Sequence, residues 1–228
     1  MGNVGLLLVG AVLFVNGVSS LGLVSARSAA PLNLFVGTAQ VVLPTLVLVQ
    51  HGSDPAVVAA TWPSYLFGFT YLWFGLLSLR GIEPQGFGFF SAFVAAVALF
   101  QAVATVGTDP VFAVIWATWA AMWSLFFVLL GLGITHVRGL DLGRATGWFL
   151  TLLGIPTCTV AAVFLIDGRW TTSPVAGLVA LAGLAVGAVA SVVLAKAGVP
   201  RLAPAARDGA STAGSGVAAR SGEALARA

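Results

Sequence analysis

The chain has 228 residues, of which 59% are hydrophobic and only 7% are charged. Soluble domains carry about 25% charged residues, so these few charges cannot cover a water-facing surface, and we expect lipid to surround most of the protein. A net charge of +3 without a basic cluster excludes a nucleic-acid partner, and one cysteine with two histidines excludes a disulfide framework and a Cys/His metal site, so we expect no metal and no cofactor.

Seven stretches of the chain are long and apolar enough to cross a membrane as helices. A spanning helix requires about 20 mostly apolar residues. Short breaks with turn chemistry separate the stretches, and the first break is Ser25–Pro31. The sequence therefore predicts an all-α, polytopic transmembrane helix bundle. The seven windows are residues 4–23, 32–50, 58–79, 88–106, 110–134, 145–166 and 174–197.

Three helices are predicted to begin with a capping residue followed by proline. An Asp or Ser side chain accepts hydrogen bonds from the first free N–H groups, and proline fits the first turn because its missing N–H has no partner there. The three pairs are Asp54-Pro55, Asp109-Pro110 and Ser173-Pro174.

The positions of Lys and Arg predict the orientation. If there are seven spans, only Arg169 lies on one side of the membrane and nine basic residues lie on the other. Cytoplasmic loops carry the excess of Lys and Arg, so we expect a multi-pass protein of the cell membrane, with its N-terminus outside and its C-terminal tail in the cytoplasm. Six spans would weaken this asymmetry, so the charges favour the seventh helix. The nine residues are Arg27, Arg80, Arg138, Arg144, Lys196, Arg201, Arg207, Arg220 and Arg227.

Composition divides the chain into three parts. Residues 1–166 hold six spans, residues 167–198 hold the additional transmembrane helix, and residues 199–228 are rich in Ala, Gly, Ser and Arg. The last part is predicted to be a disordered tail because it has too few apolar residues to form a core.

No charged residue lies in the middle of any window. Buried charges mark proton relays, ion sites and voltage sensors, so their absence argues against a pump, a proton-coupled carrier and an ion channel but allows a path for a neutral solute. The chain also lacks G-x-S-x-G, H-E-x-x-H and P-loop motifs, and no break is long enough for an extramembrane domain. We therefore expect no enzyme activity.

An aromatic stripe runs along the fifth window. Phe112, Trp116, Trp119 and Trp123 are spaced by four, three and four residues, which places them on one helix face. Membrane tryptophans usually form interfacial belts, whereas this stripe extends for about 16 Å at 1.5 Å per residue. It indicates either packing between helices or a lumen whose indole faces stack on a planar amide.

The third window carries a second such face, and the first window carries a polar one. Phe67, Thr70, Tyr71 and Phe74 share a face of the third helix, and a tyrosine hydroxyl in lipid requires a hydrogen-bond partner. Asn16 lies deep in the first helix, where an amide more often joins helices than contacts a solute.

The seventh window contains a stripe of small residues. Gly183, Gly187 and Ser191 recur every four residues, a spacing typical of closely packed membrane helices. In a chain with 28 glycines this pattern also arises by chance, so it predicts little on its own.

Several segments together resemble the AmiS/UreI family of urea channels and amide transporters. The Pro156-Thr-Cys-Thr-Val160 run is more similar to the actinobacterial amide transporters than to the acid-gated urea channels. The resemblance covers about residues 1–166 in matching order. The other matching stretches are Val9-Gly10 to Asn16-Gly17, Leu32–Gly37, Leu66–Leu72 and Ile115-Trp116 through Trp119 to Trp123.

This resemblance implies six helices around a pore in each protomer, a homohexameric ring in the membrane, and passage of urea or short aliphatic amides. The residues resembling the pore-lining positions of the family are Val9, Leu13, Asn16, Phe67, Tyr71, Trp119, Met122 and Trp123. Thr70 and Trp116, which share faces with them, complete the expected substrate path.

Three features depart from the family pattern. Leu153 aligns with a glutamate that the urea channels carry on their sixth helix, so that polar contact is absent here. Acid gating in those channels uses histidine-containing outer loops, whereas the outer breaks here are short and contain only His51; we therefore expect a constitutively open path. The seventh helix and the tail lie outside the six-helix pattern.

The favoured hypothesis is a passive channel or facilitator for urea or short amides such as acetamide. A gradient-coupled amide transporter is the alternative within the same class. A non-transporting membrane subunit, in which the aromatic faces merely pack, is the alternative from another class. The sequence does not distinguish the preferred solute.

Overall fold

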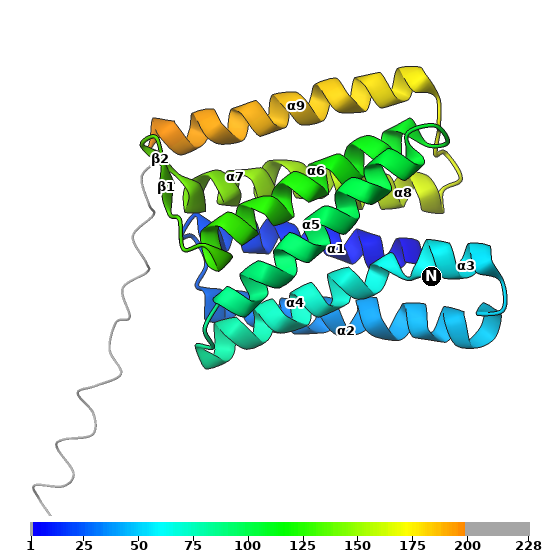
Figure 1. The fold of residues 1–228 in the computed structure, drawn as a ribbon, viewed down its shortest axis with the longest axis horizontal. Helices are drawn as coiled ribbons and strands as arrows, with labels where there is room; N and C mark the ends of the chain where they lie inside the picture. Colours follow the sequence, from blue (N-terminus) through cyan, green and yellow to red (C-terminus); the bar gives the residue numbers. More distant parts are fainter. Residues whose placement is uncertain (1, 199–228) are drawn as a thin grey trace, which may run out of the picture.

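The computed structural model describes residues 2–198, and most of them are helical. The helices run back and forth in an antiparallel bundle, with α9 lying along one side (Figure 1). The predicted tail lies outside the described residues. The elements are α1 (Gly2–Ser20), α2 (Ala26–His51), α3 (Pro55–Thr61), α4 (Pro63–Arg80), α5 (Gln85–Thr105), α6 (Pro110–Phe126), the π-helical η1 (Phe127–Gly131), β1 (His136–Val137), β2 (Leu140–Asp141), α7 (Leu142–Gly154), the π-helical η2 (Ile155–Val160), α8 (Ala161–Ile166) and α9 (Pro174–Ala197).

All seven predicted windows contain helix, and the prediction of an all-α membrane bundle is confirmed. Six helical segments among the described residues are long and apolar enough to cross a membrane. The third window is not among the six because Pro63 interrupts it and because α4, which follows, is rich in Tyr, Ser and Thr. Even so, α4 packs along α2 within the bundle.

The three predicted caps are present. Asp54 Oδ1 accepts from the N–H of Ala56 at 2.8 Å, and Asp109 Oδ1 accepts from the N–H of Phe112 at 2.9 Å. At the start of α9, Ser173 Oγ accepts a hydrogen bond from the third residue of the helix at 3.2 Å. These starts depend on local sequence alone, so sequence patterns locate them well.

The first predicted break is too long. The helix α2 begins at Ala26 after the N-cap Ser25, so Pro31 lies inside the helix and not in the loop. Pro31 is the sixth residue of α2, so it removes one intrahelical hydrogen bond. Proline is tolerated inside membrane helices because neighbouring groups pair with the backbone groups that it frees.

Glycines allow two pairs of helices to approach closely. A Cβ on Gly17 of α1 would lie 2.8 Å from the backbone nitrogen of Thr151 in α7, and one on Gly37 of α2 would lie 2.7 Å from the backbone nitrogen of Leu72 in α4. Small residues at such seams are the usual means of packing helices in lipid. The α1–α7 and α2–α4 seams therefore help to position α1 and α4, two of the three helices that carry the candidate site.

A short hairpin joins η1 to α7. β1 and β2 pair antiparallel, and the two residues between them, Arg138 and Gly139, have φ angles of 49° and 78°. Two positive φ values are typical of the tight turn that matches the twist of a hairpin. The sequence analysis predicted only a break here.

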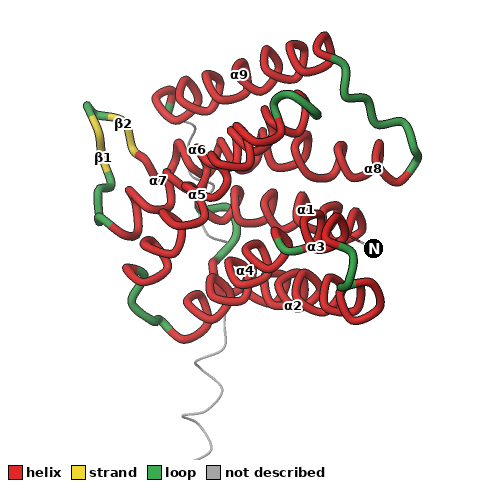
Figure 2. Tube along the Cα trace, turned by 45° about the vertical axis from the view of Figure 1, so that its right-hand side comes forward, coloured by secondary structure: helices red, strands yellow, loops and turns green. Residues whose placement is uncertain are grey.

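Basic residues are concentrated at one end of the bundle. The loops α1–α2 and α4–α5, the hairpin and the last turn of α9 all lie at what we call the hairpin end (Figures 1 and 2). Arg169, in the α8–α9 loop, lies at the opposite end, which we call the α3 end. The basic residues that the structure describes at the hairpin end are Arg27, Arg80, Arg138, Arg144 and Lys196.

Candidate functional site

The ten residues predicted to form the substrate path come from three helices and are all buried. No member of the set is more than 5% exposed. They are Val9, Leu13 and Asn16 on α1, Phe67, Thr70 and Tyr71 on α4, and Trp116, Trp119, Met122 and Trp123 on α6.

Three of these side chains form one ring cluster, which we call the Phe67 triad. The Phe67 ring centroid lies 5.0 Å from that of Trp119 and 6.3 Å from that of Trp116, and the two indoles are 4.9 Å apart in an edge-to-face arrangement. The Phe67 ring centroid also lies 5.0 Å from that of Trp123. The aromatic faces predicted on the third and fifth windows therefore meet each other in the core.

Trp123, which lies against Phe67, also lines a small cavity with a volume of about 10 Å³. A void of this size holds at most about one water molecule, so it is too small for urea, which has four heavy atoms. We expected an open path, but at this point the structure is closed to a molecule as large as urea. The cavity is lined by Leu13, Asn16, Thr70, Tyr71, Phe74, Phe87, Met122, Trp123 and Phe126.

Three of the lining residues were not among the predicted site residues, and they form a second cluster, the Phe74 triad. Ring centroids are 5.7 Å apart for Phe74 and Phe87, 6.0 Å for Phe87 and Phe126, and 6.3 Å for Phe74 and Phe126. Phe126 continues the stripe of the fifth window by three residues, so that pattern carried a signal for it. Phe87 lies on α5, and no periodicity in the sequence linked that helix to the site.

One residue that lines the cavity carries a hydrogen-bond donor without a partner. Trp123 is 1% exposed, and its indole Nε1–H has no acceptor in the structure. An unpaired buried donor costs about 1–3 kcal/mol, so a ligand carbonyl that accepted from it would be stabilised. The Thr70 hydroxyl donates to the Leu66 carbonyl at 2.7 Å and keeps a lone pair that can accept.

Asn16 joins two helices and also lines the cavity. Its Nδ2 donates to Asn33 Oδ1 at 2.9 Å, and Asn33 Nδ2 donates back to Asn16 Oδ1 at 2.7 Å. Asn16 therefore joins α1 to α2, which is the interhelical role that the sequence predicted. Each amide has two N–H groups and two lone pairs, so Asn16 keeps one donor and one acceptor beyond this pair.

Trp119 differs from Trp123 because its indole N–H is already used. Nε1 donates to Thr157 Oγ1 at 3.2 Å, and this hydroxyl in turn donates to the Leu153 carbonyl at 2.6 Å. Thr157 lies in η2, where Pro156 lacks the N–H that an α-helical turn would use. The wider π turn there directs Thr157 toward α6.

Leu153, the position that aligns with the family's glutamate, does not line the cavity. Its Cδ2 lies 2.6 Å from where a Cβ on Gly187 of α9 would be, so the side chain packs against α9. A Cβ on Gly183, one turn earlier, would meet nothing within 4 Å, so the small-residue stripe of α9 packs only at Gly187 and Ser191.

No charged side chain lines the cavity, and the described residues contain no cluster of His, Cys, Asp or Glu that could hold a metal ion. An ion would lose its water without gaining a counter-charge, which is costly in a low-dielectric interior. The lining therefore offers aromatic rings and uncharged hydrogen-bonding groups.

Comparisons with known proteins found similar membrane transporters. A model described as "AmiS/UreI family transporter" matches residues 1–169. A Rhodococcus erythropolis protein named as the transporter AmiS2 is 53% identical over 176 residues, which cover 76% of this chain and 83% of that protein. A Mycolicibacterium smegmatis protein named as a transporter of amidate substrates is 45% identical over 188 residues, covering 81% of this chain and 86% of that protein.

A solved structure has the same fold. The crystal structure of the urea channel from Helicobacter pylori superimposes with a TM-score of 0.65 at 27% identity. It covers 75% of this chain and 100% of the urea channel. The helix α9 begins beyond the residues that the family model matches.

Proposed function

Because the chain belongs to the AmiS/UreI family of transporters, we propose that it is a passive membrane channel or facilitator for urea or short-chain aliphatic amides such as acetamide. The observation that carries this proposal is the small cavity lined by the Phe74 triad, by Asn16 and Thr70, and by Trp123, whose indole N–H is unpaired; no charged side chain lines it. The ten predicted path residues and the Phe74 triad would line the route.

The chemistry of an amide fits these groups. Its carbonyl oxygen would accept from the Trp123 N–H, and its N–H groups would donate to oxygens of Asn16, Thr70 or Tyr71. The aromatic rings above and below would contact the flat faces of the solute, and they exclude bulk water. A solute that leaves water here would thus replace its hydrogen bonds to water with hydrogen bonds to the protein.

Passage requires side-chain motion. The cavity of about 10 Å³ is smaller than urea, so rings of the two triads must rotate as a molecule passes. Ring and rotamer changes need no backbone opening, and they fit a path that fluctuates without a pH-sensing loop.

The charge distribution supports an orientation. With the hairpin end in the cytoplasm, the described residues follow the positive-inside rule, because Arg169 is their sole Lys or Arg at the α3 end. The N-terminus would then lie outside and the C-terminal tail inside. We also propose a homohexamer in the membrane, each protomer with its own path, as the family resemblance implies.

Uptake by proteoliposomes tests the function. We expect urea and acetamide to enter liposomes that contain the protein faster than empty liposomes, with no dependence on a proton gradient. Dependence on the gradient would instead support a coupled transporter. Uptake equal to that of empty liposomes would contradict the proposal and support a non-transporting subunit.

Replacement of Trp119 or Trp123 by alanine tests the path. Either change removes an aromatic surface of the proposed constriction, so we expect altered flux or altered selectivity between urea and acetamide. Unchanged transport in both variants would show that the solute does not pass Trp119 and Trp123.

A further inference from the structure

The helix α9 lies on the bundle with a groove on each side. It packs on α6 and α7, and few of its residues are buried. One groove runs between α9 and η2–α8, has a volume of about 770 Å³, and is called here the α8–α9 groove. Its walls are mainly apolar and include Leu152, Pro156, Phe164, Ala176, Gly183 and Leu184.

A cation lies at the α3 end of this groove. Arg169 lines the groove, and its guanidinium carbon lies 5.2 Å from the centroid of the Phe164 ring, which also lines it. Among the described residues no carboxylate forms an ion pair with Arg169, although Asp167 is only two positions away in the chain. The guanidinium is thus held over the groove by a ring and keeps its hydrogen-bond donors available.

The neighbouring side chain makes the groove mouth rigid. Trp170 also lines the groove, and its indole N–H donates to Asp109 Oδ2 at 2.8 Å. The Trp170 ring centroid lies 5.2 Å from that of Phe112 at the start of α6. The loop that carries Arg169 is therefore tied to α6, and the charge does not swing freely in solvent.

We propose that the α8–α9 groove binds one phospholipid, with the headgroup phosphate on Arg169 and an acyl chain along the apolar walls. The volume lies within the range of about 300–1,000 Å³ that is usual for ligand pockets. Arg presents a planar set of N–H donors that matches a phosphate. The site depends on α9, which lies outside the residues that the family model matches.

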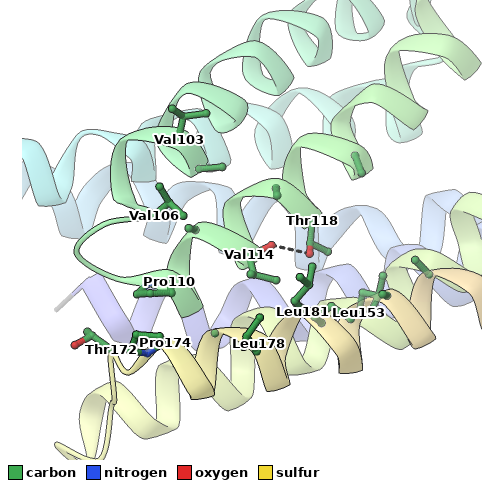
Figure 3. Close-up of a pocket in the computed structure, with 18 of the residues that line it drawn as sticks. Val103, Val106, Pro110, Val114, Thr118, Leu153, Thr172, Pro174, Leu178 and Leu181 are labelled. Atoms are coloured by element: carbon green, nitrogen blue, oxygen red, sulfur yellow. Dashed lines mark hydrogen bonds between the residues drawn. The ribbon is translucent and has the colours of Figure 1, made fainter.

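The second groove shows why the cation matters. It lies between α9 and the α5–α6 hairpin, with Val103, Val106, Val114, Leu178 and Leu181 on its walls and a volume of about 990 Å³ (Figure 3). No charged side chain lines it. The bilayer already solvates acyl chains as well as an apolar wall does, so a groove without a headgroup contact has no basis for retaining one particular lipid.

Lipid retention by the purified full-length protein tests the proposal. The protein in mild detergent is mixed with phosphatidylglycerol, and the bound lipid per protomer is counted by native mass spectrometry. Arg169→Gln should lower the apparent affinity by roughly tenfold, because hydrogen bonds to charged groups are the stronger ones. Arg80→Gln, which removes a cation at the other end of the bundle, is the matched control and should leave retention unchanged.

A second pair of variants tests the acyl-chain half of the site without changing charge. Gly183 faces open space in the groove, so Gly183→Phe fills the groove without a clash and should displace the lipid. Val186 lies on the outer face of α9 and lines neither groove, so Val186→Phe adds the same ring and should leave the lipid bound.

The outcomes separate the possible occupants. Loss of lipid in both Arg169→Gln and Gly183→Phe, with both controls unchanged, supports the proposal. Retention that is unaffected by either change overturns it. A change of oligomeric state in Gly183→Phe with unchanged lipid also overturns it, because the groove would then hold a second copy of the chain. Inorganic phosphate that competes fully with the lipid would show a bare anion site and would overturn the acyl-chain assignment.

Discussion

The two buried tryptophans of α6 allow a sharp test, because one indole N–H is paired and the other is not. We predict that Trp123→Phe lowers amide transport without the stability loss that Trp119→Phe causes. Both changes remove the same part of an indole ring from a site less than 3% exposed. The difference between the two variants therefore isolates the two N–H groups.

The stability difference follows from the hydrogen bonds. Trp119→Phe loses a 3.2 Å hydrogen bond to Thr157, worth about 0.5–1.5 kcal/mol, whereas Trp123→Phe removes an unpaired donor whose burial costs about 1–3 kcal/mol. The ring truncation costs about the same in both variants and cancels. Trp123→Phe should therefore be more stable than Trp119→Phe by about 3 kcal/mol, measured by denaturant titration in detergent.

For transport we expect the reverse order: Trp123→Phe, the more stable variant, should transport amides more slowly than Trp119→Phe. If the Trp123 N–H donates to the solute carbonyl in the constriction, its loss raises the barrier by about 1 kcal/mol, or roughly fivefold in rate. Because a smaller ring also widens the path, the assay compares two solutes. We expect the ratio of acetamide to ethylene glycol uptake to fall in Trp123→Phe, since an amide carbonyl is the stronger acceptor.

Two results would refute this reasoning. An unchanged ratio in Trp123→Phe, together with a lowered ratio in Trp119→Phe, would show that the unpaired N–H does not contact the solute. Equal stability of the two variants would show that the Trp123 N–H finds an acceptor in the membrane-embedded protein.

Three further predictions concern packing and orientation. Asn16→Leu should lower stability by about 1–2 kcal/mol, and adding Asn33→Leu should restore part of it because no amide is then left unpaired; thermal unfolding of the single and double variants measures this. Gly17→Ala should reduce the yield of folded protein, judged by size-exclusion chromatography, because its methyl group would meet the α7 backbone; normal yield would mean that the seam is looser than described. An impermeant thiol reagent added to intact cells should label Ser53→Cys but not Ile82→Cys, since the single native cysteine is buried; the reverse pattern would invert the proposed orientation.

The sequence by itself determined the elements of this fold. Continuous apolar windows specify helices because lipid leaves every backbone group to be paired within the segment. Capping side chains such as Asp109 act on N–H groups two or three residues away, so local sequence predicts where helices begin. The absence of charge in the windows likewise favours a neutral solute, because charged side chains at membrane depth are the usual marks of ion sites and proton relays.

The tertiary structure decided which faces meet. Helical periodicity groups residues on one helix but does not say how that helix is rotated against its neighbours. Phe87 could therefore be placed beside Phe126 only from the packed bundle. The same holds for the two tryptophans: the stripe treats Trp119 and Trp123 alike, yet only Trp119 meets a hydroxyl. That difference arises because Pro156 and the π turn of η2 set the direction of Thr157, which depends on backbone geometry across helices.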